Sequence, residues 1–377
     1  MPSTGFSLPN LVTLFASRAA QYDHSGTLAQ DNLQDLKKAG LLALTVSPQY
    51  GGGGKTLRDI LPLLETLAQG DPSTTLILAM QCLHHHSIAT AHHWPEEVRK
   101  MVSVAAVQDG ALLNALRVEP ELGTPSRGGI PATRVQYHNG QWVLNGCKIY
   151  STGSTALRWG IVWAATQEAE PRLGHVLVPL NAPGVRIDPT WNQMGMRATA
   201  SHTIYFDNVV IPESFLVDLR TPEGWKNSGT DIIMWHALCI ASLYNGVALA
   251  AKDWLVSFLH ARKPANLGAS LATLPRFHTL MGEIQSLLST NQAVMAEWLT
   301  HYENGTATPT TANLAKYIVT ENAIASVQKG VAAIGNPALS RDNPLERHLR
   351  NVLCARIHTP QADTALAAAG KAALGVV

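Results

Sequence analysis

Five histidines lie close together in one stretch, and imidazoles gathered on a helix can bind a metal ion or line a pocket. On a helix, His85 and His92 would share a face, and so would His86 and His93. No two histidines stand four residues apart beside a carboxylate, so the spacing does not predict a metal site. We expect no metal, and we predict a pocket wall in which His85 contacts the substrate. The five residues are His84, His85, His86, His92 and His93.

A glycine-rich segment, Pro48–Lys55, places four consecutive glycines before a lysine. Such a segment suggests a loop that holds a phosphate. The phosphate-loop pattern GxxxxGK[ST] requires a glycine where Gln49 stands, however, and no strand clearly precedes the segment. We therefore predict a flexible turn between two helices.

A third segment, Met194–Glu213, combines a strand pattern with a polar entry. Thr203–Ile211 is rich in β-branched and aromatic residues and ends before a proline, which predicts a strand. Arg197 precedes this strand, and small or hydroxyl-bearing residues follow as far as Ser201. Small side chains let the backbone approach a ligand closely, and hydroxyl groups supply hydrogen-bond donors. We predict that Arg197 and Ser201 contact the substrate.

The rest of the chain must position these segments, and its pattern changes twice. Residues 1–108 show the three- and four-residue spacing of apolar side chains that is typical of amphipathic helices. Residues 109–218 contain short apolar or alternating segments and Asn-Gly turns, which predict a small β-barrel or sandwich. Residues 219–377 return to long helical patterns and predict a four-helix bundle. The predicted fold is thus a multidomain α+β protein: an N-terminal helical domain, a central β-domain and a C-terminal helical bundle.

The individual elements follow from the same patterns. Helices are predicted at Leu57–Ala68, Thr74–Ala91, Asp231–Leu259, Leu274–Glu303, Thr311–Ala333, Pro344–Arg356 and Ala365–Leu374. Strands are predicted at Gly160–Ala165, His175–Leu180, Val185–Ile187 and Thr203–Ile211, with a hairpin turn at Asn139–Gly140 and a further strand starting at Asn145–Gly146.

The composition limits the class of protein. A length of 377 residues exceeds one ordinary core and indicates two or three domains,. The net charge of +1 without a basic block argues against a nucleic-acid partner,. The four cysteines lie far apart without CxxC spacing, which indicates reduced thiols,. The N-terminus lacks the pattern of a signal peptide, and we expect no run of about 18 apolar residues that spans a membrane. We expect a cytoplasmic protein.

Four motifs, together with the order of the domains, resemble those of the acyl-CoA dehydrogenase superfamily of flavoproteins. The resemblance covers almost the whole chain. Ala115–Pro120 resembles the family's Thr-Glu-Pro loop beside the flavin ring, and Lys148–Gly153 resembles its flavin-contacting segment. Met194–Arg197 with Phe206–Glu213 resembles its signature at the end of the β-domain, and Pro344–Arg350 resembles its final major helix.

The resemblance implies bound FAD, with its ring between the β-domain and the bundle and its diphosphate directed toward a neighbouring subunit. It therefore also implies a homodimer or homotetramer. An aromatic residue can stack near the ring and a hydroxyl can donate to its N5 edge. The matching positions for flavin contact are Val118 through its backbone, Gly123, Thr124, Tyr150 and Thr152, with Arg262 and Gln328 contributed by the paired subunit.

The chain departs from the family at the catalytic base. The family's glutamate removes an α-proton while a β-hydride passes to flavin N5. The usual position of that glutamate holds Thr359, which cannot act as a base at neutral pH. The alternative position in the family, on the first long helix of the bundle, falls on His236. An imidazole has an ordinary pKa of about 6.5 and suits the task. His358, beside the lost glutamate, is a second candidate.

These departures leave three hypotheses. The first is an acyl-CoA dehydrogenase-like oxidoreductase that holds FAD, acts on an acyl thioester and passes electrons to an electron-transfer flavoprotein. The second is a two-component monooxygenase that receives reduced FMN or FAD from a separate flavin reductase and activates oxygen. The third is a flavin-binding protein that has lost its catalytic function, since a fold does not fix a reaction.

Overall fold

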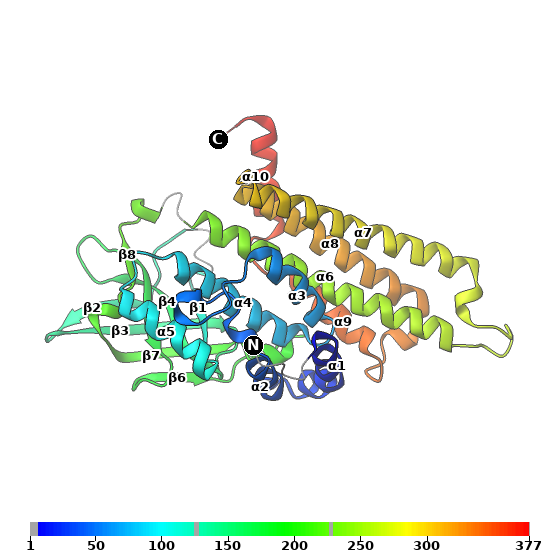
Figure 1. The fold of residues 1–377 in the computed structure, drawn as a ribbon, viewed down its shortest axis with the longest axis horizontal. Helices are drawn as coiled ribbons and strands as arrows, with labels where there is room; N and C mark the ends of the chain where they lie inside the picture. Colours follow the sequence, from blue (N-terminus) through cyan, green and yellow to red (C-terminus); the bar gives the residue numbers. More distant parts are fainter. Residues whose placement is uncertain (1–6, 124–127, 226–228, 377) are drawn as a thin grey trace.

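The computed structural model describes residues 7–123, 128–225 and 229–376, and its elements follow the predicted order of helices, strands and helices. Figure 1 shows the strands gathered at one end of the molecule and the long C-terminal helices extending to the other. The N-terminal helices lie between them. The predicted α+β fold is therefore confirmed.

The N-terminal helices surround α4, which carries the histidines. The side chain of Asp71 caps α4 by accepting hydrogen bonds from the backbone N–H groups of Ser73 and Thr74,. This helix packs against α3, α6 and β1, so it reaches both the bundle and the sheet. The five helices of this region are α1 (Leu8–Ser25), α2 (Gln30–Lys38), α3 (Leu57–Ala68), α4 (Pro72–Thr90) and α5 (Glu96–Asp109).

The glycine-rich segment is a turn between elements, and its glycines are needed for close packing. The backbone N–H of Gly53 donates to the carbonyl of Ala43 at 3.0 Å, and that of Lys55 donates to the carbonyl of Leu44 at 2.8 Å. A Cβ atom at Gly52 would lie 2.2 Å from a carbonyl oxygen. The segment thus folds back on its own chain, which is a structural use of glycine.

The described strands form one mixed sheet of eight strands, in the order β6-β7-β3-β2-β4-β5-β8, with β1 paired to β4. The pairs β1–β4 and β2–β4 are parallel, and the other pairs are antiparallel. The strands are β1 (Leu112–Leu116), β2 (Arg134–His138), β3 (Gln141–Ser151), β4 (Leu157–Thr166), β5 (Leu173–Pro179), β6 (Val185–Asp188), β7 (His202–Ile211) and β8 (Asp218–Arg220).

Of the two Asn-Gly pairs, one makes a turn and the other does not. Asn139 and Gly140 have φ values of 50° and 83° and connect β2 to β3, as predicted,. Asn145 and Gly146 instead lie inside β3, where the register against β7 shifts. Gly146 is required there because a Cβ atom would lie 2.5 Å from the hydroxyl of Thr133. The prediction that a strand starts at Asn145 was wrong.

The C-terminal bundle is organised around α6, which packs against α3, α4, α8 and α9. By length and composition α6 would pass for a membrane span, but 72% of its apolar window is buried inside the protein. The expectation that no such apolar run exists was therefore wrong, and the run is the central helix of the bundle. The helices are α6 (Thr230–Ala261), α7 (Pro275–Glu303), α8 (Pro309–Ile334), α9 (Pro344–Leu353) and α10 (Ala362–Leu374).

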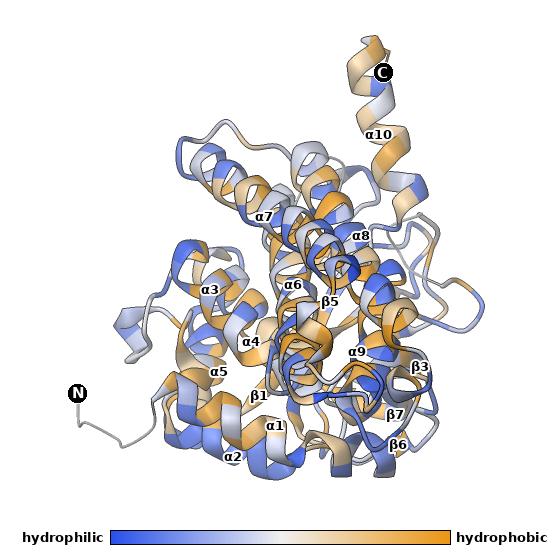
Figure 2. Ribbon diagram, turned by 90° about the vertical axis from the view of Figure 1, so that its right-hand side faces the viewer, coloured by the Kyte–Doolittle hydropathy of each residue, from blue (hydrophilic) through white to orange (hydrophobic). Residues whose placement is uncertain are grey.

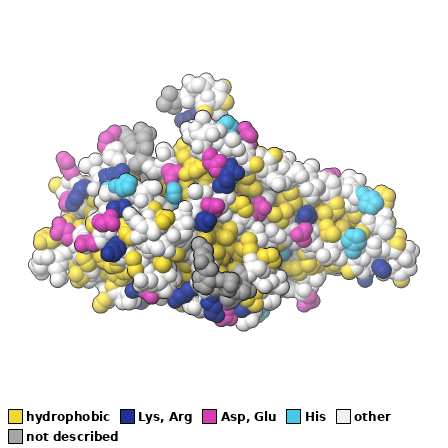
Figure 3. All heavy atoms as spheres, viewed as in Figure 1, with side chains coloured by type: hydrophobic (Ala, Val, Ile, Leu, Met, Phe, Trp, Pro, Cys, Tyr) yellow, Lys and Arg dark blue, Asp and Glu magenta, His cyan; other side chains and the backbone are white. Residues whose placement is uncertain are grey.

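The last helix stands apart from the rest of the bundle (Figure 2). Figure 2 shows α10 projecting from the body of the molecule, and only Ala365 of this helix is buried. Figure 3 shows basic and acidic side chains interspersed over the face it presents.

Candidate active site

Residues that are far apart in the sequence meet where α6 approaches the turn after α9. The imidazole of His236, on α6, hydrogen-bonds the backbone of Thr359. Nδ1 of His358 lies 3.0 Å from the hydroxyl of Tyr244, which is also on α6. The charge of His236 contributes to the lowered pKa of His358, after the larger effect of burial. The structure thus brings together the three residues that the sequence suggested for catalysis, and their roles remain predictions.

A buried lysine holds this turn in place. The side chain of Lys316 on α8 is 3% exposed, and its ammonium group donates hydrogen bonds to three backbone carbonyls. The acceptors are Ala355 at 3.1 Å, His358 at 2.8 Å and Pro360 at 3.1 Å. All three protons of the ammonium group therefore have an acceptor, which fixes the backbone on both sides of Thr359.

The imidazoles of the site are neutral at pH 7. Burial lowers the pKa of His236 to about 4, and the cations Lys316 and Arg117 act in the same direction. Burial likewise lowers the pKa of His358 to about 3, with contributions from His236 and Lys316. Burial raises the pKa of the Tyr244 phenol well above its ordinary value, so the phenol stays protonated,.

The histidines of α4 divide among several environments. His84 hydrogen-bonds the side chain of Asn114 on β1, and burial lowers the pKa of His84 to about 3. His85 is 1% exposed, and neither ring nitrogen has a hydrogen-bond partner among the described residues. The predicted substrate contact through His85 is therefore not supported by its position, because the ring is enclosed by protein. Among the histidines of α4, His84 is the one whose pKa is lowered by the charge of His236, after the larger effect of burial.

Two other histidines of this region anchor α4 to its neighbours. Nε2 of His86 lies 2.6 Å from a carboxylate oxygen of Asp231, and its ring stacks on Trp235 with centroids 3.8 Å apart. Nε2 of His93 lies 2.9 Å from a carboxylate oxygen of Asp218 on β8. The first contact fixes the start of α6 immediately before His236.

The β-domain contributes a row of hydroxyl groups. The hydroxyls of Thr152 and Ser201 are 3.1 Å apart, and those of Ser201 and Thr199 are 2.8 Å apart. Asn114 donates to the backbone carbonyl of Thr152 at 3.1 Å, which links this row to His84. Tyr150, with φ of 57°, is 57% exposed on the same strand end. Thr152 and Ser201 thus lie side by side.

The loop that resembles Thr-Glu-Pro is held by a buried ion pair. A carboxylate oxygen of Glu119 lies 2.6 Å from Nζ of Lys148, and both side chains are nearly inaccessible. Backbone bonds join Glu119 to Gly123, and Val118 bridges Ile149 on β3. Gly123 has φ of 70° and open space where a side chain would stand. Thr124, the next predicted contact, lies outside the described residues.

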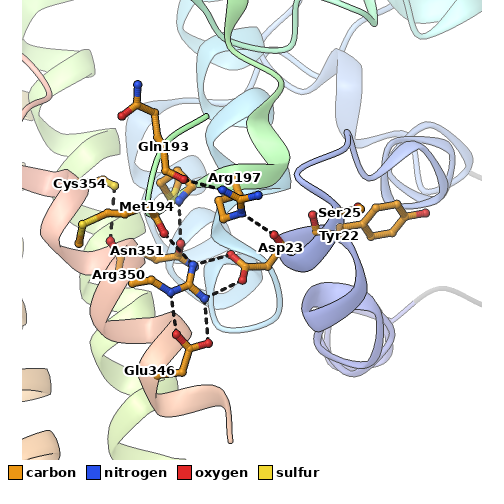
Figure 4. Close-up of polar contacts among 11 residues, drawn as sticks. Tyr22, Asp23, Ser25, Gln193, Met194, Arg197, Glu346, Arg350, Asn351 and Cys354 are labelled. Atoms are coloured by element: carbon orange, nitrogen blue, oxygen red, sulfur yellow. Dashed lines mark hydrogen bonds and ion pairs between the residues drawn. The ribbon is translucent and has the colours of Figure 1, made fainter. Parts of the chain in front are cut away.

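The family-like motif at Met194–Arg197 lies on a junction between all three regions of the fold, which Figure 4 shows. The guanidinium of Arg350 on α9 donates to the carbonyl of Met194 at 2.7 Å and pairs with Asp23 of α1 at 2.6 Å. Asn351 accepts from the backbone N–H of Met196 at 2.8 Å. The motif therefore fixes the β-domain against the first and ninth helices.

Arg197 belongs to this junction. Its Nε donates to the carbonyl of Asp23 at 2.7 Å, and its Nη1 donates to the carbonyl of Gln193 at 2.9 Å (Figure 4). These donors are occupied by the protein, so the predicted substrate contact through Arg197 has no support from its position. Arg262 and Gln328 are exposed, at the end of α6 and on α8. Neither joins the cluster of histidines within this chain.

The structure adds four residues to the site. His84, on α4, is one of the five histidines of the predicted pocket wall, whereas the sequence did not predict a role for Asn114 on β1, Arg117 directly after β1 or Lys316 on α8. The sequence could have indicated Arg117 as a site residue, because it is a cation within an otherwise apolar strand segment. Asn114 and Lys316 carried no such signal, since their positions depend on how strands and helices pack.

The donor set fits the flavin that the sequence resemblance implies. An electron-rich ring edge accepts hydrogen bonds, and this site offers the hydroxyls of Thr152 and Ser201 and the guanidinium of Arg117,. The hydroxyl of Ser151, the last residue of β3, is buried without a partner among the described residues. No described carboxylate contributes to the pKa of His84, His236 or His358.

Comparison with known proteins agrees with this geometry. Family models match three parts of the chain: the acyl-CoA dehydrogenase N-terminal domain at residues 13–100, the middle domain at 117–209 and the C-terminal domain at 238–361. The putative acyl-CoA dehydrogenase YdbM of Bacillus subtilis is 34% identical over 356 residues, which cover 93% of this chain and 91% of that protein.

Two further relatives are named for other chemistry or ligands. L-evernosamine nitrososynthase of a Micromonospora species is 26% identical over 92% of this chain and 83% of its own. The structure of KijD3 in complex with FMN and a dTDP-linked amino-keto sugar superposes with a TM-score of 0.84. That pair is 25% identical, and the match covers 98% of this chain and 92% of KijD3.

Proposed function

Because this chain belongs to the acyl-CoA dehydrogenase family of flavin-dependent oxidoreductases, we propose that it is an oxygenase built on that fold. It receives reduced FMN or FAD from a separate flavin reductase and transfers oxygen to a small molecule. The observation that carries the proposal is the character of the site. The groups that act on the pKa values of its histidines are Lys316, Arg117 and other imidazoles, and no described carboxylate acts with them.

Such a site is poorly suited to removing a proton from carbon. A general base works best when its pKa lies near the operating pH. The pKa of His236 is lowered to about 4, mainly by burial, so its imidazole is a weak base. Thr359 offers no base at all. Cations and neutral N–H groups instead stabilise negative charge that develops on an oxygen atom.

The two catalytic imidazoles are complementary in their hydrogen bonding. The phenol of Tyr244 stays protonated and lies 3.0 Å from Nδ1 of His358. We assign the phenol as the donor of this hydrogen bond, which places the ring proton of His358 on Nε2 and makes that atom a donor. The neutral imidazole of His236 donates a hydrogen bond to the backbone carbonyl of Thr359. Its other ring nitrogen therefore keeps a lone pair. His358 then donates to an oxygen that gains charge, and His236 accepts a hydrogen bond from a substrate N–H or O–H group.

When bound, reduced flavin supplies the two electrons that activate O2, of which one atom enters the substrate and the other leaves as water. We assign contact with the flavin to the backbone of Val118, Gly123, Tyr150 and Thr152, and contact with the substrate to Ser201. Arg262 and Gln328 are assigned to the flavin of a paired subunit in a homodimer or homotetramer, which agrees with their exposure at the end of α6 and on α8.

A second candidate function is acyl-CoA dehydrogenation with FAD, His236 as the base and an electron-transfer flavoprotein as acceptor. The position of His236 at the site and the name of the Bacillus relative favour it.

Two measurements separate these candidates. In an anaerobic titration of the flavin-loaded protein with a panel of acyl-CoA thioesters, an oxygenase leaves the flavin absorbance unchanged. Bleaching by any thioester would establish the dehydrogenase instead. In the second measurement, protein titrated in the absence of oxygen with chemically reduced FMN or FAD should bind the reduced form more tightly than the oxidised form. The absence of binding to either form would reject both enzymes and favour a protein without catalytic function.

A further inference from the structure

Four residues form a row across neighbouring strands of the sheet, and the charge of one of them, Arg117, acts on His84 and His236 of the site. Trp163 on β4 pairs with His175 on β5, and His175 pairs with Asp218 on β8. Leu116, the last residue of β1, pairs with Val162, so Arg117 follows beside Trp163. The guanidinium carbon of Arg117 lies 5.3 Å from the centroid of the Trp163 ring. The aromatic ring therefore holds the arginine in one orientation.

Arg117 differs from the other arginines that lie over tryptophans. Arg158 lies over Trp159 and pairs with Asp109 at 2.8 Å. Arg220 lies over Trp225 and pairs with Asp218 at 2.7 Å. By contrast, no acceptor within the described parts of the chain lies within hydrogen-bonding or ion-pairing distance of the Arg117 guanidinium, whose side chain remains accessible to solvent.

The groups around Arg117 do not neutralise it. Its charge acts on His84, His175 and His236, which are imidazoles, and on Lys148, which is itself a cation. Asp218, the carboxylate of the row, is directed to Arg220 and His93 instead. Desolvation by the surrounding protein lowers the pKa of Arg117, although its side chain is exposed to solvent. Its charge is thus left without a counter-ion among the described residues.

We propose that Arg117 binds the anionic oxygen group of a ligand in the active site, in the first place a carboxylate of the substrate. The planar fork of donors on a guanidinium matches a carboxylate in two parallel hydrogen bonds. The inference deepens the proposed function, on which it rests, by giving the substrate an acidic group. The electron-rich edge of reduced flavin also carries negative charge, so it is the second group that Arg117 could bind.

Matched pairs of small ligands test the proposal. Binding of acetate, butyrate and benzoate to the flavin-loaded protein is measured by calorimetry and compared with binding of the corresponding amides, which have the same shape without charge. At least one carboxylate should bind more tightly than its amide. Arg117→Gln should weaken that binding by about tenfold or more, because hydrogen bonds to charged groups contribute about 1.5–3 kcal/mol. Arg158→Gln, which also removes an arginine from a tryptophan ring, should leave it unchanged.

Flavin affinity forms the second arm. If Arg117→Gln leaves carboxylate binding intact but weakens binding of reduced FMN or FAD, the anionic group is that of the flavin. If neither affinity changes, the proposal is overturned. Arg117→Lys keeps the charge without the fork and should give an intermediate loss, with a melting temperature to show that it folds. Failure of the wild-type protein to bind any flavin would instead reject the proposed function.

Discussion

The ammonium group of Lys316 lies 2.8 Å from the backbone carbonyl of His358 and joins the eighth helix to the turn that carries the site. The same lysine lowers the pKa values of His236 and His358 through its charge, after the larger effect of burial. One side chain therefore fixes the backbone of this turn and contributes to the lowered pKa values of both imidazoles.

Replacing this lysine should disturb both properties. In Lys316→Met, three buried carbonyls lose their donor, and we expect unfolding free energy to fall by about 1–3 kcal/mol. The pKa of His358 should rise because a nearby cation is gone, and NMR titration of the imidazole in flavin-free protein measures this. Turnover should fall by about 10- to 100-fold through misplacement of the turn.

A lysine on the same helix provides the control. Lys329 pairs with Glu283 at the surface, and Lys329→Met should cost less than about 1 kcal/mol and leave the His358 titration unchanged,. An unaltered His358 pKa in Lys316→Met would disprove the electrostatic role of the lysine.

Tyr244→Phe should remove the preference of His358 for one tautomer. The variant removes the hydroxyl that lies 3.0 Å from Nδ1, so the ring proton is free to occupy either nitrogen. We expect turnover to fall by about tenfold with little change in KM, and stability to fall by about 1 kcal/mol. Nitrogen-15 chemical shifts of the imidazole report the tautomer directly. Identical shifts in the variant and the wild type would contradict the assignment, and Tyr22→Phe, at an exposed hydrogen bond, serves as the control.

Lys148→Met should be the most destabilising of these changes. It leaves the buried carboxylate of Glu119 without its cation, and losing one partner of a buried ion pair costs about 3–5 kcal/mol,. Burial raises the pKa of Glu119, but the bonds from Lys148 and Thr133 outweigh this and keep it below its ordinary value. Combining Lys148→Met with Glu119→Gln should recover part of the loss. Urea denaturation measures all three proteins, and a double variant no more stable than Lys148→Met would count against the pair.

Acidification should destabilise the protein through its buried histidines. Burial lowers the pKa values of His84, His85 and His348 from 6.5 to about 3. The unfolded chain therefore binds protons that the folded chain excludes, and stability is lost as the pH falls from about 6.5 toward 3. Each group contributes up to about 1.4 kcal/mol per pH unit in that window.

The measurement is urea denaturation at several pH values between 7.5 and 4.5. His85→Leu removes one imidazole that has no hydrogen-bond partner, so its stability should depend less steeply on pH than that of the wild type. An equal slope in both proteins would show that His85 is not responsible.

Much of the fold could be predicted because its signals are local. The hairpin turn at Asn139–Gly140 follows from the positive φ values that those residue types tolerate,. The long C-terminal helices follow from apolar spacing, and each was predicted to within a few residues at either end. The wrong prediction at Asn145 has the opposite cause. Its Asn-Gly pair has the composition of a turn, but pairing with β7 holds it inside a strand.

The amino-acid sequence by itself determined the order of the domains and the chemistry that is missing. By its resemblance to the family, it predicts that Thr359 stands at the position of the family's glutamate, and it supplies histidines close to that position. Those facts depend only on residue types and their order. Tertiary structure alone decided which side chains meet: Lys316 reaches the turn through helix packing, and Arg117 lies beside Trp163 through strand register.

Tertiary structure also decided how each group is used. It directed the donors of Arg197 to backbone carbonyls and left those of Arg117 free of any described acceptor. It lowered the pKa of His236 by burial, although the residue type alone suggests a base near neutrality. Both outcomes depend on desolvation and on partners far away in the chain, which the order of residues along one segment does not specify.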